Sequence, residues 1–146
     1  MTTIAFKDGV IAADSYEIDG HRVANSDCIK QKNINGIVMF GCGESALIKT
    51  MMQDISLEAK ECGIVNCDSN VWALVDGVIH EYYVREGVYM YNVVDYPYSI
   101  GSGSAFALAA MDHGKTASEA VEYAKERDIY TGGKVRTYNI ETGVHK

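Results

Sequence analysis

The sequence predicts an α+β fold, a layered sandwich in which helices cover antiparallel sheets. Hairpin-type dipeptides separate short apolar or alternating runs, at Asp8-Gly9, Asp19-Gly20, Asn35-Gly36 and Asp76-Gly77. Blocks of helical periodicity interrupt these hairpins, and Val and Ile far outnumber Leu, which favours sheet. Antiparallel hairpins mixed with blocks of helix are typical of α+β domains.

The strands are expected mainly in hairpin pairs. In chain order they are expected at Thr3–Phe6, Val10–Asp14, Ile29–Ile34, Ile37–Phe40, Val71–Val75, Val78–Val84, Val88–Tyr91 and Val135–Ile140. The third pair continues across a weaker turn at Glu86-Gly87, so a meander of three strands is expected there. The last strand stands alone near the end of the sequence.

Helices are expected in two blocks between these strands. Over Glu44–Cys62 apolar side chains recur every three or four residues, which predicts one amphipathic helix. Ser104–His113 is rich in Ala and ends at Gly114, a residue that suits the position just after a helix. The pattern Thr116-Ala-Ser-Glu119 is a capping box and predicts a further helix directly behind it.

Length and charge limit the classes of protein that fit the sequence. A chain of 146 residues is expected to form a single domain over residues 1–146. Thirteen basic and twenty acidic residues give a net charge of −7, which argues against nucleic acid and anionic membranes as partners. No apolar run approaches the ~18 residues that a membrane span needs.

The N-terminal sequence and the cysteines indicate the compartment. The first residues lack the charged and then apolar order of a signal peptide, so we expect a cytoplasmic protein. The four cysteines have neither Cys-x-x-Cys spacing nor zinc-finger distances to histidines. We therefore expect buried, reduced thiols.

Thr2 is the first residue with a chemical signature. Met1 precedes a small residue, the context in which an initiator methionine is usually removed, and its removal would leave Thr2 first. An N-terminal threonine carries a nucleophilic hydroxyl and a free amine, whose ordinary pKa of ~7.7–8.0 suits a general base near neutral pH. Very many proteins begin Met-Thr with no catalytic purpose, so this signal needs support from the rest of the chain.

Three further features provide that support. Asp14 follows an apolar strand, and Lys30 and Lys32 stand two apart on one face of the second hairpin. An ammonium near Thr2 would lower the pKa of its amine, and a carboxylate would hold that lysine in place. Gly41-Cys42-Gly43 stands at a strand-to-helix junction, where backbone N–H groups and the helix dipole can stabilise an oxyanion. Taken singly, each feature is better explained by a turn or a solvated strand face.

Taken together and in order, these residues resemble a family. The sequence resembles the proteasome β-type subunits and their bacterial relative HslV, threonine proteases of the N-terminal nucleophile hydrolase superfamily. The matching stretches are Thr2-Thr-Ile-Ala-Phe-Lys, Gly9-Val-Ile-Ala-Ala-Asp14-Ser15, Lys30 before Ile34-Asn-Gly36, Phe40-Gly-Cys-Gly43, Ile100-Gly-Ser-Gly-Ser104 and Arg127-Asp-Ile-Tyr-Thr-Gly-Gly133. The resemblance implies a four-layer αββα sandwich with two antiparallel sheets.

The resemblance also implies the centre of the site. Thr2 would be the nucleophile and its own amine the base, acting through a water, with Asp14 and Lys30 beside it. Lys30 is preferred to Lys32 because it stands four residues before Ile34-Asn-Gly36, where the lysine of the family falls.

Further residues match supporting positions of the same family. Ser102 and Asp128 would support the amine and the attacking hydroxyl, and Thr131 would add a hydroxyl near the site. The N–H of Gly43, or that of Cys42, would stabilise the oxyanion. Backbone carbonyls around Asp128 and Thr131 match a place for a structural cation, monovalent or divalent, and no other cofactor is implied.

The activity that the resemblance implies is hydrolysis of peptide bonds within peptides or unfolded proteins. Members of the family stack in rings around a closed chamber. The resemblance therefore implies a homo-oligomer of two rings, with an AAA+ unfoldase ATPase as a partner. Only Met1 stands before Thr2, so methionine removal alone would activate the chain. The sequence supplies one helix after Gly43 where the family has two, which leaves the ring and the ATPase contact open. Glu44 and Ser45 follow the oxyanion loop, and a carboxylate there would favour basic side chains in the substrate.

Two other functions fit the same sequence. The chain could be a catalytically silent structural subunit of the same ring, or an amidohydrolase that uses the same N-terminal nucleophile on a small amide. The presence of all five residues Thr2, Asp14, Lys30, Ser102 and Asp128 favours the peptidase, because a structural subunit has no need of the full set.

Overall fold

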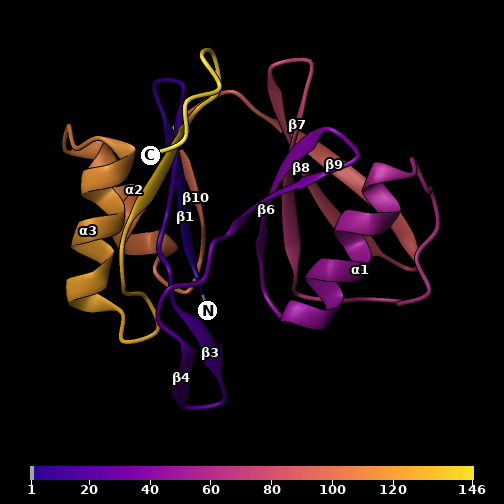
Figure 1. The fold of residues 1–146 in the computed structure, drawn as a ribbon, viewed down its shortest axis with the longest axis horizontal. Coiled ribbons are helices and arrows are strands. Elements are labelled where there is room, and N and C mark those ends of the chain that lie inside the picture. The colour runs from indigo at the N-terminus through magenta and orange to yellow at the C-terminus, as the bar shows by residue number, and fades with distance from the viewer. Residues whose placement is uncertain (1) are drawn as a thin grey trace. The chain divides into compact units, whose positions relative to one another are not determined.

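Two sheets, each with helix on one face, form separate units of the chain (Figure 1). The structure is a computed structural model that describes residues 2–146. The first unit contains the described residues up to Lys30 together with Tyr96–Lys146, and the second contains Gln31–Asp95. The paired strands are antiparallel in both units, so the predicted α+β class with antiparallel sheets is confirmed.

The first unit is built on a four-stranded sheet in the order β10-β1-β2-β11. Its strands are β1 (Thr3–Lys7), β2 (Val10–Ala13), β10 (Tyr98–Gly101) and β11 (Arg136–Asn139). Asp8 and Gly9 both have positive φ, at 50° and 77°, as a tight hairpin between β1 and β2 requires. The first predicted hairpin is thus confirmed.

The register of this sheet brings three of the predicted site residues to one end. Thr3, the first residue of β1, pairs with Gly101, the last residue of β10, and Ile4 pairs with Ala13 at the end of β2. Because neighbouring strands run in opposite directions, the residues just beyond these three strand ends lie at the same edge. They are Thr2, Asp14 and Ser102.

Two helices, α2 (Ser104–Asp112) and α3 (Ala117–Arg127), cover one face of the first sheet. Small side chains, mainly Ala, fill the contact, so the helices pack close to the strands. The predicted capping box is confirmed: the N–H of Glu119 donates to Thr116 Oγ1 at 3.1 Å, and Glu119 Oε1 accepts from the Thr116 N–H at 3.0 Å.

Three strands of the first unit lie outside the prediction. The turn at Asp19-Gly20 joins β3 (Glu17–Asp19) and β4 (Arg22–Asn25) into a separate hairpin. The side chains of this hairpin are largely polar and exposed, so the sequence lacks the alternation of apolar residues that would indicate its strands. β10 is the third of these strands. It was not predicted because its four residues run into a Gly-Ser stretch, which is typical of a loop.

The predicted strand Ile29–Ile34 begins later than expected. In the structure β5 covers only Gln31–Ile34, and residues 26–30 are irregular. The N–H of Cys28 donates to the Ser15 carbonyl at 2.8 Å, which draws this segment toward the end of β2. The expectation that Lys30 and Lys32 share a strand face is therefore wrong, since the Lys30 side chain is 8% exposed whereas Lys32 is solvent-exposed.

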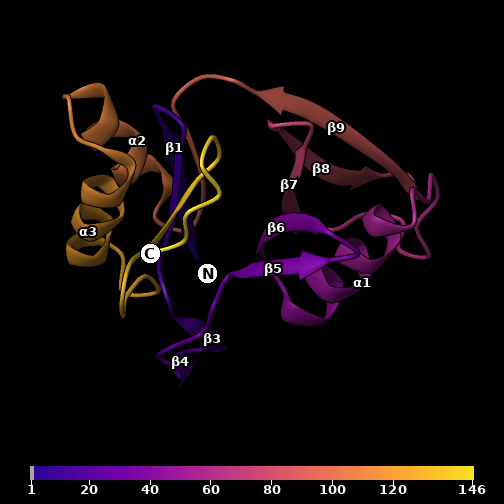
Figure 2. The same cartoon turned by 45° about the horizontal axis from the view of Figure 1, so that its top comes forward.

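The second unit is a five-stranded meander with one helix (Figure 2). Its strands follow chain order as β5, β6 (Ile37–Cys42), β7 (Asn70–Val75), β8 (Val78–Arg85) and β9 (Val88–Val94). α1 (Ser45–Ser56) packs its buried face, Met51, Met52 and Ile55, on Met39 and Val71 of the sheet. The second and third predicted hairpins are thus confirmed.

α1 ends earlier than the predicted helix Glu44–Cys62. The chain beyond Ser56 turns to the edge of β9, where the N–H of Cys62 donates to the Gly87 carbonyl at 2.7 Å. The N–H of Tyr89 in turn donates to the Lys60 carbonyl at 3.0 Å. These hydrogen bonds with the sheet replace the last turns of helix that the periodicity predicts.

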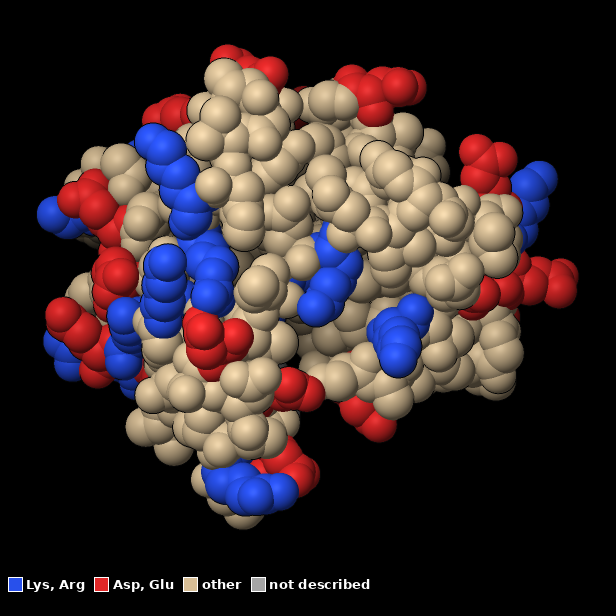
Figure 3. Space-filling view, in the orientation of Figure 1, with Lys and Arg blue, Asp and Glu red and all other residues tan. Residues whose placement is uncertain are grey.

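Charged side chains of both signs are interspersed on the face shown in Figure 3. Within residues 2–146, none of the helices has the length and apolar character needed to cross a membrane.

Candidate active site

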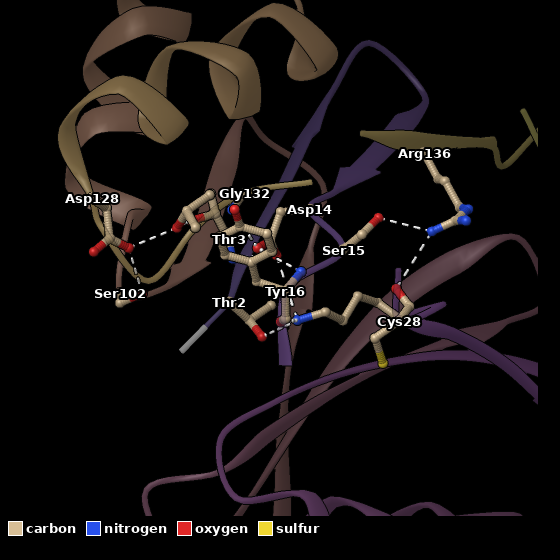
Figure 4. A network of polar contacts seen from close by, with 12 residues as sticks. Thr2, Thr3, Asp14, Ser15, Tyr16, Cys28, Ser102, Asp128, Gly132 and Arg136 are labelled. Atoms are coloured by element: carbon tan, nitrogen blue, oxygen red, sulfur yellow. Dashed lines mark hydrogen bonds and ion pairs between the residues drawn. The ribbon is translucent and has the colours of Figure 1, made fainter. Parts of the chain in front are cut away.

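The Lys30 ammonium lies at the centre of a polar network in the first unit (Figure 4). Lys30 Nζ donates to Thr2 Oγ1 at 2.5 Å and to the Tyr16 carbonyl at 2.6 Å. It also forms an ion pair with Asp14 Oδ1 at 3.5 Å, and the two side chains are 8% and 0% exposed. A buried ammonium that donates to a hydroxyl oxygen lowers the cost of forming an alkoxide there, an arrangement that can activate a hydroxyl group chemically.

The Asp14 carboxylate is held by three backbone N–H groups as well as by Lys30. Oδ1 accepts from the N–H of Thr3 at 3.1 Å, while Oδ2 accepts from those of Gly132 at 3.0 Å and Tyr16 at 3.3 Å. The donors come from the start of β1, the end of β2 and the loop before β11. These hydrogen bonds fix the carboxylate beside the buried ammonium with which it forms the ion pair.

A second cluster surrounds Asp128, the residue that follows α3. Asp128 Oδ2 accepts from Ser102 Oγ at 2.5 Å and from Thr131 Oγ1 at 2.6 Å, and Oδ1 accepts from the Tyr130 N–H at 3.2 Å. Thr131 Oγ1 also lies 2.7 Å from the hydroxyl of Thr3. The cluster therefore connects Asp128 to the residue that follows Thr2, through two hydroxyl groups.

Hydrogen bonds lower the pKa of Asp128. Burial of the side chain raises its pKa, but the hydrogen bonds from Ser102, Thr131 and the Tyr130 N–H outweigh burial, so the pKa lies below its ordinary value. Because the folded-state pKa is the lower one, the carboxylate stabilises the fold above the unfolded pKa of ~3.9, and this contribution disappears as the pH falls through the folded pKa.

This shift predicts a pH-dependent effect of Asp128→Asn. At pH 7 the substitution should lower the free energy of unfolding, because it removes a charge that accepts three hydrogen bonds. The difference between wild type and variant should shrink once the pH falls well below ~4, where the unfolded carboxylate is protonated. Urea unfolding of both proteins at several pH values measures it, and a difference that stays constant with pH would contradict the assigned cause.

Close packing of a loop backbone completes the site around Asp14. A Cβ at Gly132 would lie 2.3–2.4 Å from two atoms of the Tyr16 ring. Only glycine lets the loop backbone approach this ring closely enough for its N–H to reach Asp14. The Gly-Gly pair that ends the stretch Arg127–Gly133 thus has a packing reason as well as a turn-forming one.

The predicted oxyanion donors belong to the second unit. Gly43 follows β6 with a φ of 128°, and a Cβ there would lie 2.3 Å from Ser69 Oγ. The N–H of Glu44, the residue before α1, donates to the same Ser69 oxygen at 3.2 Å. The strand-to-helix junction predicted at these residues is confirmed, whereas the oxyanion role of Gly43 or Cys42 and the specificity role of Glu44 and Ser45 stay predictions.

The network also contains residues that were not predicted from the sequence as parts of the site: Thr3, Ser15, Tyr16, Cys28, Gly132 and Arg136. Several act through backbone atoms, which the residue type does not reveal. Thr3 and Ser15 are polar residues that directly follow Thr2 and Asp14. This adjacency is the feature of the sequence from which their place in the site could have been predicted. Arg136 is one charged residue in the last predicted strand, where an outward-facing charge is ordinary.

The described residues contain no group of three His, Cys, Asp or Glu side chains that could hold a metal ion. The predicted structural cation near Asp128 and Thr131 would rely on backbone carbonyls. One of these, the Asp128 carbonyl, already accepts from the Thr131 N–H at 3.1 Å, and both carboxylate oxygens of Asp128 have donors. The side chains at this place thus satisfy one another.

Two solved structures of a bacterial protein have a similar fold. A structure of Thiobacillus denitrificans BPH in complex with epoxomicin matches at a TM-score of 0.67 and 18% identity, covering 94% of this chain and 96% of that one. A second structure of Thiobacillus denitrificans BPH matches at a TM-score of 0.64 and 18% identity, covering 94% and 95%. No family model matches the chain, and neither does any curated protein.

These comparisons correct the identification of the chain with the proteasome β-type and HslV family. The matching structures are described as BPH and not as a proteasome subunit, and no family model supports the membership, so that identification is wrong. At 18% identity the likeness shows the fold alone. Any function must therefore be argued from the residues of the site itself. The site of Thr2, Asp14 and Lys30 is formed by this chain whatever its family is. Met1, which we expect to be removed, lies outside the described residues.

Proposed function

We propose that this chain is a threonine-type endopeptidase that hydrolyses peptide bonds through Thr2. The observation that supports this proposal most strongly is the hydrogen bond from Lys30 Nζ to Thr2 Oγ1, at 2.5 Å, with Asp14 behind the lysine. A threonine hydroxyl is a weak nucleophile unless a base or a neighbouring cation activates it. Stability alone poorly explains a buried lysine that donates a hydrogen bond to this hydroxyl, because burying a charge costs folding free energy.

In the proposed mechanism, cleavage of the bond before Thr2 exposes its amine. The amine takes the proton of Oγ1, directly or through water, while Oγ1 attacks the peptide carbonyl and forms an acyl ester. The amine then gives the proton to the leaving nitrogen. A water attacks the ester in the second half of the reaction, with the same amine as base, and restores the free hydroxyl.

Lys30 and Asp14 have different roles in this mechanism. The Lys30 ammonium stabilises the developing alkoxide and lowers the pKa of the nearby Thr2 amine, so that more of it is neutral at pH 7. Asp14 holds the ammonium in place and balances its charge. The Asp128 cluster positions Thr3, and through it the amine end of Thr2. The N–H of Gly43 remains the proposed oxyanion donor.

Two structural features belong to the same proposal. We propose that the two helix-covered sheets are the halves of a four-layer αββα sandwich. We also propose that the chain works as a homo-oligomer which keeps the threonine away from folded proteins, with an unfoldase ATPase as the partner that supplies substrate. A monomer in light scattering at working concentration would contradict the homo-oligomer.

The structural neighbour suggests a chemical probe. Thiobacillus denitrificans BPH was solved in complex with epoxomicin, and 94% of the present chain matches that structure. We propose that epoxomicin also binds at Thr2 of this chain. The similarity of the folds supports this choice of probe, and the Lys30 contact supports Thr2 as the place of binding.

A matched pair of proteins tests the function. The chain that begins at Thr2 should cleave fluorogenic peptides, whereas the same chain with Met1 retained should be slower by roughly 10²–10⁴-fold, because a peptide nitrogen cannot act as the base. Intact mass confirms which form is present. Equal turnover by the two forms would contradict the role of the amine, and no turnover by a folded chain that begins at Thr2 would favour the silent structural subunit.

A further inference from the structure

The segment that carries Lys30 has little secondary structure to hold it. Residues 26–30 lie between β4 and β5, are irregular and are mostly exposed, yet the Lys30 side chain is 8% exposed. A side chain on an irregular segment can reach a fixed point only if other contacts fix the backbone near it. The position of the ammonium over Thr2 therefore depends on what holds Asp27 and Cys28.

Two of those contacts come from Arg136 on β11. The others are the hydrogen bonds from the Cys28 N–H to the Ser15 carbonyl and from the Asp27 N–H to Asn25 Oδ1. Arg136 Nη2 forms an ion pair with Asp27 Oδ1 at 2.5 Å, and Nη1 donates to the Cys28 carbonyl at 3.5 Å. Nη1 also donates to Ser15 Oγ at 2.8 Å, and the Ser15 hydroxyl in turn donates to the Lys134 carbonyl. Figure 4 shows the Arg136 side chain reaching both Ser15 and Cys28.

These partners stand next to the two charged residues of the site. Ser15 follows Asp14 directly, and Cys28 stands two residues before Lys30. Arg136 itself is anchored by the sheet, where it pairs with Ala13, the residue before Asp14. Its side chain is 16% exposed, so the guanidinium is largely shielded from water. A planar fork of several N–H donors can hold two backbone segments at a set separation, which a single ammonium cannot do as well.

Resting on the function proposed above, we propose that Arg136 is a positioning residue that sets the separation between Asp14 and Lys30. It joins the end of β2 to the segment 27–30, so that the Lys30 ammonium reaches the Thr2 hydroxyl. In this proposal Arg136 acts through Lys30 and contacts neither the Thr2 hydroxyl nor the peptide substrate. Its loss should therefore act on the chemical step and on the charge near the Thr2 amine, and only weakly on substrate binding.

The test uses Arg136→Gln and Arg136→Lys in protein that begins at Thr2. R136Q should lower kcat for a fluorogenic peptide by about 10–100-fold, as a shift of the catalytic group by about 1 Å does, with KM nearly unchanged. The pKa of the Thr2 amine, measured from its acylation rate against pH, should rise by about half a unit or more because Lys30 moves away. R136K should restore part of both the kcat and the amine pKa, since lysine keeps the positive charge and a single donor nitrogen.

Arg22→Gln is the matched control. Arg22 pairs with Asp19 at 2.9 Å in the β3–β4 hairpin, where both side chains are largely exposed, so R22Q should leave kcat and the amine pKa unchanged. An unchanged amine pKa and an unchanged kcat in folded R136Q would overturn the proposal. A fall in kcat that is fully explained by a smaller fraction of folded protein would overturn it as well. If R136Q does not fold, R136K decides by the same two readouts. A wild-type protein without turnover refutes the proposed function, and the amine pKa still decides the role of Arg136.

Discussion

Thr2→Ala should abolish peptide hydrolysis and leave the fold intact. The substitution removes the attacking oxygen, and the loss of a nucleophile costs on the order of 10⁴-fold or more in kcat. The fold should survive because Thr2 precedes β1 and its hydroxyl is one of several acceptors around Lys30. Turnover of a fluorogenic peptide, together with thermal unfolding, measures both halves of this expectation.

Thr2→Ser is the matched control for this substitution. Serine keeps the hydroxyl and the amine and loses only the methyl group, so T2S should retain a measurable part of the activity. Activity in T2A close to that of wild type would show that another residue is the nucleophile. Loss of the fold in T2A would remove the evidence for a chemical role, and T2S would then have to separate the hydroxyl from the packing.

Lys30→Met should reduce kcat by roughly 10²–10³-fold, the cost of removing a positioned charge from a developing anion. It should also raise the pKa of the Thr2 amine toward the ordinary ~7.7–8.0, so the acidic limb of the pH–rate profile moves upward. The free energy of unfolding should fall by less than the roughly 3–5 kcal/mol of a broken buried ion pair, because Asp14 keeps three backbone donors.

Lys32→Met separates this effect from a general loss of positive charge. Lys32 lies on β5, is exposed and stands two residues from Lys30. K32M should therefore keep the wild-type kcat and pH profile. Equal effects of the two substitutions, or an unchanged pH profile in K30M, would contradict the proposed place of Lys30 beside the amine.

Much of the fold follows from local chemistry in the sequence. Pairs such as Asp8-Gly9 mark tight turns because both residues adopt positive φ, and apolar runs on each side of such turns form antiparallel pairs. The capping box of Thr116 and Glu119 fixes the start of α3 in the same local way. Features of this kind depend on neighbours in the chain, so the sequence alone reveals them.

The features of the fold that were not predicted from the sequence depend on contacts between segments far apart in the chain. The helix expected to reach Cys62 ends at Ser56, because the chain beyond it bonds to the edge of β9. Ile29 and Lys30 lie outside β5 although the strand was predicted over Ile29–Ile34, because Ser15 and Arg136 hold the preceding Asp27 and Cys28. Periodicity does not distinguish these sites from ordinary helix or strand, since the competing hydrogen bonds come from elsewhere in the fold.

The candidate site divides along the same line. Lys30 was distinguished from Lys32 only by its match to a family position, since both lysines were expected on one strand face. Thr2 and Asp14 are predictable because each brings a functional group to a position next to a strand end. The backbone donors of Thr3 and Gly132 are not, since every non-proline residue has an N–H and only the fold shows which of them face a carboxylate.

The most direct test of the central claim is the mass and position of a covalent adduct on Thr2. Protein that begins at Thr2 is treated with a peptide epoxyketone, whose two electrophilic carbons can take a hydroxyl and an amine from one residue. We expect one adduct per chain, mapped to Thr2 through both groups, and none in T2A or in protein that retains Met1. No adduct on folded protein, or an adduct carried by another residue such as Cys28, would contradict it.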